Sequence, residues 1–224
     1  DYLAKVNGTY EFPNVVNSIA AYSNQVLRWA ACNGHFSIVD RLLGKKEDGT
    51  YEFPDVVGGI TADDNEALRL AARAGHKEIV DRLLGKSEDG TYEFPAVVAE
   101  IAVYDNEALR GAARNGHLAV VDRLLGKNKD GTYEFPGVVG GTEACDNYAL
   151  LWSGRNHHHE LSCILAQVSW PSISGMPENL KNDAEVMGSI REGFRMQSVR
   201  RGNVYLLNCF VGDSAPLIFS HAGK

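Results

Sequence analysis

One heptapeptide recurs in this chain at a fixed step of 41 residues. It reads Asn-Gly-Thr-Tyr-Glu-Phe-Pro at 7–13, and it returns with Asp in place of Asn at 48–54, 89–95 and 130–136. A fixed period of this length is typical of stacked arrays, in which no unit can bury its apolar face alone. An asparagine keeps the same step, so the sequence predicts four units that begin near Asn24, Asn65, Asn106 and Asn147.

Each unit reads as two short antiparallel helices joined by a glycine. In the second unit Leu68 precedes Ala71-Ala72 by three and four residues, which places all three on one helical face. Gly75 stands where a helix needs a left-handed C-terminal residue. Ile79-Val80 and Leu83-Leu84 follow at spacings of three and four, which indicates an amphipathic second helix.

This pattern resembles the ankyrin repeat, whose motif has Leu, Ala-Ala, Gly-His and Leu-Leu in the same order. Three units match, and the resemblance covers roughly residues 13–168. It implies a mainly α-helical solenoid that binds a partner protein. The Asn-Glu-Ala-Leu-Arg form of the units is also similar to repeats in effector proteins of intracellular bacteria.

The units depart from the family motif in two ways. Glu66-Ala67 and Arg69 replace its Thr-Pro and first His, which predicts the loss of the side-chain bonds that lock the loop entry. The period also exceeds the family's length of about 33 residues, through an insertion at 44–51 and its equivalents. The Asp-Gly pair in this insertion predicts a projecting hairpin.

Two further local features are expected in each unit. Pro54 and the valines after it predict a third, short helix or a 3₁₀ turn over 54–60, repeated at 95–101 and, in the first copy, from Pro13. Asp64, or Asn65 beside it, is predicted to cap the first helix, and Ser23 has that place in the first unit.

An aromatic residue of the insertion is a candidate for partner binding. Aromatic side chains dominate interface energetics, so an exposed row of tyrosines would suit a partner. Because the residue is identical in every copy, it could instead pack with Phe53, Phe94 and Phe135 against the adjacent unit, and we favour that interpretation. The tyrosines are Tyr51, Tyr92 and Tyr133.

Positions that differ between copies are the better indication of recognition. They flank the Ala-Ala pair at the end of the first helix, which lines the concave groove in proteins similar to ankyrin. Arg and Trp are enriched at binding hot spots, although a solvated helix face with ordinary charge pairs would look the same. The candidates are Trp29, Leu70, Arg73, Arg114, Trp152 and Arg155.

The charge of the chain indicates the kind of partner. Net charge is −7, and residues 1–170 carry 16 Lys and Arg against 24 Asp and Glu. Phosphate contacts dominate affinity for nucleic acids, so an acidic array is a poor nucleic-acid binder, and we expect a protein partner with a basic surface. No apolar run is long enough to span a bilayer, so we expect no membrane partner.

The chain is expected to be a cytoplasmic monomer, or to act in the host cytoplasm if it is a bacterial effector. Four cysteines without a Cys-x-x-Cys pair indicate reduced thiols. The start at Asp1 shows neither an initiator Met nor a signal-peptide pattern, so we interpret the segment as part of a longer protein.

The fourth unit and the C-terminal segment break the pattern. His157-His158-His159 replaces Gly-His, and His159 and Cys163 lie one helical turn apart, but no fourth ligand is evident, so no metal or other cofactor is predicted. We divide the chain into an array, 1–168, and a small α/β segment, 169–224. In that segment we expect one helix over 178–198 and strands at 204–211 and 217–220, and expect the helix to pack back on the last repeat.

Three functions compete. The first is a non-catalytic interaction scaffold. The second is a fragment of a larger enzyme or effector whose active domain lies outside this segment or at 169–224, although no catalytic motif supports it. The third is a repeat that associates with itself end to end.

Overall fold

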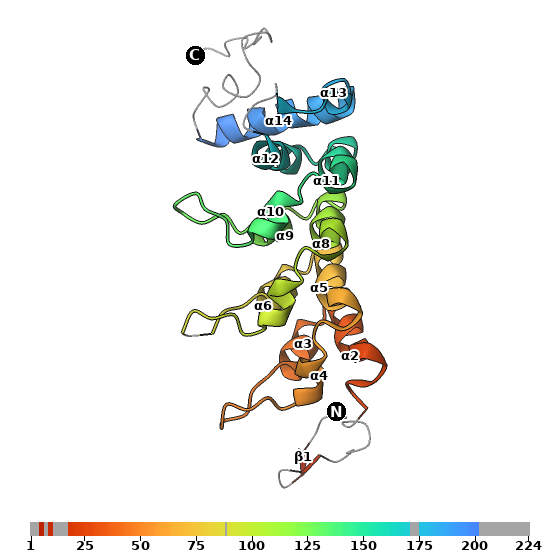
Figure 1. Ribbon diagram of the computed structural model, residues 1–224, viewed down its shortest axis with the longest axis vertical. Helices are drawn as coiled ribbons and strands as arrows, with labels where there is room; N and C mark the ends of the chain where they lie inside the picture. The colour runs from red at the N-terminus through yellow and green to blue at the C-terminus, as the bar shows by residue number, and fades with distance from the viewer. Residues whose placement is uncertain (1–4, 7–8, 11–17, 88, 171–174, 202–224) are drawn as a thin grey trace, which may run out of the picture. The chain divides into compact units, whose positions relative to one another are not determined.

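The computed structural model describes residues 5–6, 9–10, 18–87, 89–170 and 175–201, with side chains as far as 197 in the last range (Figure 1). The chain divides into two compact units, 1–141 and 142–224. The fourth helix pair therefore groups with the C-terminal helices, whereas the repeat pattern of the sequence predicted a boundary after residue 168.

In the first unit, three antiparallel helix pairs stack along the chain (Figure 1). The first helix of each pair contacts the first helix of the next, and the second helices do the same. The first helices are α2 (Ala21–Cys32), α5 (Ala62–Ala74) and α8 (Val103–Arg114). The second helices are α3 (Phe36–Leu42), α6 (Lys77–Leu83) and α9 (Leu118–Leu125). Short helices after the loops are α4 (Pro54–Gly58), α7 (Pro95–Ala99) and α10 (Pro136–Gly140).

The predicted apolar positions form the core of this stack. Leu68, Ala71 and Ala72 are fully buried, so the small alanines allow neighbouring helices to approach closely. The predicted short helices are α-helical and begin at proline, whose fixed φ suits the first helical position. The copy expected from Pro13 lies outside the described residues.

Glycine and histidine together make the turn between the helices of a pair. Gly34 and Gly75 have φ of +74° and +82°, the left-handed region that favours glycine. The ring of His76 lies against Gly34, and its Nε2 is 3.1 Å from the carbonyl oxygen of Cys32, a bond that needs Nε2 protonated. The histidine of one unit thus satisfies a carbonyl at the helix end of the preceding unit.

The start of each first helix differs from the prediction. Three consecutive residues there, such as Asp63, Asp64 and Asn65, have φ between +52° and +62°, which is a left-handed turn. The buried amide of Asn65 donates a hydrogen bond of 2.8 Å to the carbonyl of Val97, while its Oδ1 has no partner in the described structure. The predicted caps, Asp64 or Asn65 here and Ser23 in the first unit, were therefore wrong. No side-chain capping bond is made at the described starts of α5 and α2, and the side chain of Asn65 contacts the short helix α7 instead.

An arginine compensates for the lost Thr-Pro and His. Arg69 donates to the carbonyls of Asp64 and Asp63 at 3.0 and 2.8 Å, and its guanidinium also pairs with Glu107 of the next unit. Arg28 makes the same pair with Glu66. The bonds of the motif's Thr and His are absent with those residues, but other bonds replace them, since the arginine holds the left-handed turn and the junction together.

The insertions form small hairpins, which project on one side of the first unit (Figure 1). Lys45 pairs with Tyr51 in a single antiparallel bridge, and the backbone N–H of Lys46 donates to Thr50 at 2.8 Å. The later copies have the same bridge. At the N-terminus, β1 (Lys5–Val6) and β2 (Thr9–Tyr10) form a two-stranded antiparallel pair in the equivalent stretch.

The second compact unit contains the fourth helix pair, α11 (Ala144–Arg155) and α12 (His159–Ser169), and the helices α13 (Glu178–Lys181) and α14 (Ala184–Arg201). The helix expected over 178–198 is thus two helices. Asp183 separates them, because its Oδ1 accepts hydrogen bonds from the N–H groups of Glu185 and Val186 at the start of α14.

Helix α14 packs back on the fourth helix pair, as predicted. Its expected apolar face is buried: Val186, Met187, Ile190 and Phe194 are at most 6% exposed. The described structure is mainly helical, and the two strands expected in the C-terminal segment lie outside the described residues. No helix in the described part of the chain is both long and apolar enough to cross a membrane.

Candidate protein-binding surface

The C-terminal ends of the first helices carry the predicted recognition residues of the first compact unit. Trp29 is 65% exposed, Leu70 is half-buried, and Arg73 and Arg114 are exposed. Each follows or precedes the buried alanine pair of its own helix, so the helix geometry that buries the alanines turns these side chains outward.

The next unit holds the backbone of Arg73 firmly. Its carbonyl oxygen accepts a hydrogen bond of 2.7 Å from Asn115 Nδ2 and lies 3.1 Å from His117 Nε2. A Cβ placed on Gly111 would lie only 3.2 Å from Arg73 Cβ, so the glycine leaves room for the arginine. The stacking of the units thus fixes the base of this exposed guanidinium.

The second compact unit carries the two remaining helix-end candidates. Trp152 is half-buried, and its ring centroid lies 5.9 Å from that of Tyr148 on the same helix. Arg155 is exposed and forms an ion pair of 3.0 Å with Asp183, at the start of α14. The structure therefore places Arg155 in a contact that joins α11 to α14.

The loop tyrosines are half-buried rather than fully exposed. The rings of Tyr51 and Phe94 have centroids 6.1 Å apart, and Tyr92 and Phe135 repeat this distance in the next unit. Lys127 lies over the ring of Tyr133 at 5.8 Å from its centroid. Tyr51 and Tyr92 thus pack on the following unit, and only part of each ring is left for a partner.

Charged groups connect these tyrosines to neighbouring units. Tyr92 Oη donates a hydrogen bond of 3.0 Å to Glu134, which also pairs with Lys86 at 3.0 Å and Arg123 at 2.9 Å. Burial works to raise the pKa of Glu134, but the bonds from Lys86 and Tyr92 and the charge of Arg123 outweigh it and lower the pKa. Burial, and then the bond to Glu134, raise the pKa of Tyr92.

The hairpin tips present ionised aspartates. At the first tip the hydroxyl and the backbone N–H of Thr50 both donate to Asp48, and these bonds lower the pKa of that carboxyl. Asp89 and Asp130 have the same bonds and the same direction of shift. Each of the three tips therefore carries an ionised carboxylate that two hydrogen bonds fix to its own turn.

Several exposed apolar side chains were not predicted from the sequence. Tyr22, Val26, Phe36 and Ile38 lie on α2 and α3 and are 38–83% exposed. An alignment of the copies contains a signal for one of them, because Val26 occupies a position where the other units have alanine.

The histidine run does not form a metal site in the described residues, which contain no group of three potential ligands. His157 has φ of +59° and stands where the other units have the turn glycine. His159 Nδ1 lies 2.9 Å from Ser189 Oγ of α14, so His159 contributes to the packing of α14.

Comparison with known proteins supports the resemblance to ankyrin repeats. A family model described as ankyrin repeats (3 copies) matches residues 27–134. Neither the search of curated proteins nor the search of solved structures finds a match. The matched residues cover the three stacked helix pairs of the first compact unit from residue 27 within α2 onward, with their Ala-Ala pairs and Gly-His turns. The repeats of residues 27–134 thus belong to the ankyrin repeat family.

Proposed function

We propose that this chain is an interaction scaffold that binds a partner protein along the C-terminal ends of its first helices. Ankyrin repeats generally mediate protein–protein interaction, and such domains are typically non-catalytic. The observation that carries the proposal is the contrast at the helix ends. The alanine pair is buried and unchanged in three units, whereas the residue before it changes from Trp29 to Leu70 and the residue after it changes from Cys32 to Arg73.

The residue types at these positions suit recognition. Tryptophan and arginine supply the largest share of hot-spot contacts in protein interfaces. The backbone of Arg73 is held by two side chains of the next unit, so less conformational entropy is lost when a partner binds there. Tyr51, Tyr92 and Tyr133 add a second, partly exposed row on the loops.

The charge of the chain favours a protein partner with a basic surface. A net charge of −7 increases the rate of encounter with positively charged proteins and opposes binding to nucleic acids. We propose that the chain acts as a cytoplasmic monomer without catalytic activity of its own, and that it binds neither nucleic acid nor membrane.

A pull-down from lysate with three proteins tests this proposal. The double variant Arg73→Ala/Arg114→Ala should lose the captured partner by about tenfold or more while its thermal midpoint stays nearly unchanged, because hot-spot residues contribute more than 1 kcal/mol each. Lys77→Ala/Lys181→Ala is the matched control, since it removes the same charge from locally paired surface lysines. Equal capture by all three proteins would contradict the proposal.

A second variant separates the two parts of the surface. Tyr51→Ala/Tyr92→Ala should weaken capture less than the arginine variant and should lower the thermal midpoint, because these rings pack on the following unit. If instead the tyrosine variant loses the partner and the arginine variant keeps it, the binding surface lies on the loops and not on the helix ends.

A further inference from the structure

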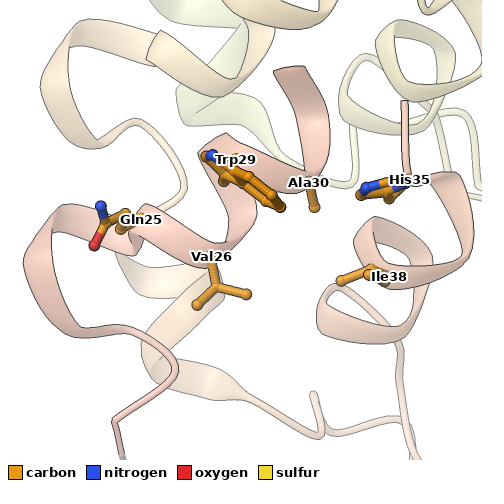
Figure 2. Close-up of a pocket in the computed structure, with 6 residues that line it drawn as sticks. All are labelled: Gln25, Val26, Trp29, Ala30, His35 and Ile38. Atoms are coloured by element: carbon orange, nitrogen blue, oxygen red, sulfur yellow. The ribbon is translucent and has the colours of Figure 1, made fainter. Parts of the chain in front are cut away.

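One face of the first helix pair is apolar and exposed. Val26, Trp29 and Ile38 border a hollow of about 390 Å³ between α2 and α3, and Figure 2 shows their side chains around this space. Gln25 and His35 lie at its two sides. Exposed fractions of 43% for Val26 and 42% for Ile38 are unusual for branched aliphatic side chains in the described structure.

The same positions are covered in the other units of the stack. Ala67 and Ile79, which correspond to Val26 and Ile38, are each 1% exposed. Ala108 is also 1% exposed. The difference follows from stacking, because α2 and α3 contact α5 and α6. A helix pair is thus the element that covers this face in every junction of the first compact unit.

A histidine and an arginine of each later unit of the stack make polar contacts with the unit before it. His76 Nε2 lies 3.1 Å from the Cys32 carbonyl at the end of the preceding first helix. Arg82 donates from Nε to Asp40 at 3.0 Å and from Nη2 to the carbonyl of Leu43 at 2.8 Å, both on the preceding unit. A covering helix pair therefore offers helix-end carbonyls to the histidine and a carboxylate to the arginine.

The first helix pair keeps both of these donors. His35 and Arg41 stand at the positions of His76 and Arg82. Arg41 pairs with Glu52 as Arg82 pairs with Glu93, but its side chain is 45% exposed against 16% for Arg82. The exposed face is thus equipped with the hydrogen-bond donors of an interior junction.

One contact of the interior junctions is changed. Arg28 pairs with Glu66 of the following unit, and Gln25 occupies the place of that glutamate in the first helix pair. Because Gln25 carries no carboxylate, an arginine of a docked helix pair would find no ion-pair partner at this point. Its contact with α2 is therefore expected to be apolar, over Val26 and Trp29.

We propose that the face made by Val26, Trp29, His35, Ile38 and Arg41 docks an antiparallel helix pair of the repeat type, stacked in the register of the array. The occupant presents carbonyls at the end of its first helix to His35, a carboxylate on its second helix to Arg41, and an apolar side to Trp29. Of the residues proposed above to bind a partner protein, only Trp29 belongs to this face, so the inference stands whether or not Arg73 and Arg114 bind that partner.

A chain that carries a helix pair at this place tests the inference. A copy of residues 62–84 joined ahead of residue 3 keeps the 41-residue step of the array. Docking should cover Trp29, so acrylamide should quench the fluorescence of this residue at least twofold less than in the original chain. The signal of Trp29 is isolated by subtracting the fluorescence of the Trp29→Phe variant. The urea midpoint should rise, because a further unit adds one stabilising interface.

Two controls make the result decisive. An extension of the same composition in scrambled order should leave both readouts at the values of the original chain. Ile38→Asp should remove the gain in the extended chain while changing the original chain little. Unchanged Trp29 quenching in the extended chain would overturn the inference, as would a dimer of the original chain, detected by sedimentation, in which Trp29 is already covered by a second copy.

Discussion

The side-chain amide of Asn65 donates a hydrogen bond of 2.8 Å to the carbonyl of Val97, 32 residues further along the chain. Asn24 and Asn106 make the same bond to Val56 and Val138 at 2.7 Å. The bond connects the left-handed turn before a first helix to the short helix that follows the loop. Because it is buried, it fixes how the loop and the next unit return to the stack.

Asn65→Ala is expected to destabilise the protein by about 1–3 kcal/mol, the usual result of leaving a buried polar group without its partner. Urea denaturation measures this loss. Asn65→Ala has two effects: it removes the hydrogen bond, and it places alanine in the left-handed conformation. Asn65→Gly separates them, because glycine adopts that conformation without a Cβ penalty and so loses the hydrogen bond without the backbone strain. A glycine variant as stable as the original chain would show that the bond contributes nothing.

Gly75→Ala is expected to be more costly than Gly90→Ala, although the two glycines have nearly the same φ, +82° and +83°. Either alanine adopts the left-handed region at a cost of about 1–2 kcal/mol. At Gly75 the new Cβ would also lie 2.5 Å from His117 Nδ1, whereas nothing lies within 4 Å at Gly90. Equal thermal midpoints for the two variants would show that the histidine moves aside freely.

Leu68→Ala should destabilise the protein by about 2–5 kcal/mol, since Leu68 is fully buried and its truncation leaves a cavity. Leu70→Ala should cost about 1 kcal/mol, because a half-buried side chain loses less apolar burial. Denaturant titration compares the two. A large loss at Leu70 would show that this residue belongs to the core and not to the recognition surface.

Stability should decrease in acid in part through Glu134. Its folded-state pKa is lowered, so its contribution is present above the unfolded pKa of about 4.3 and is lost as the pH falls through the folded value. Glu134→Gln should therefore reduce the stability near neutral pH and flatten its decrease below about pH 5. Urea midpoints at several pH values measure both effects, and parallel profiles for the two proteins would exclude a role for this carboxyl.

Much of the repeat was predictable because its signals are local. The 41-residue step, the Ala71-Ala72 pair and the glycine at 75 correctly predicted the helix pairs and their turns. The apolar face of Val186 and Phe194 likewise predicted a packed helix, whose interruption at Asp183 was missed. The helix-end and loop candidates for partner binding stay predictions, since the structure contains no partner.

The sequence by itself therefore determined the helix pairs, their turns and the family of the repeats in residues 27–134, since spacings of three, four and 41 residues are properties of the chain alone. The tertiary structure decided what Asn65 and Arg69 do, because their partners Val97 and Glu107 lie 32 and 38 residues away. It also decided that Ile38 is exposed while Ile79 is buried: the two residues are identical, but among the described residues the packing of α6 on α3 covers Ile79.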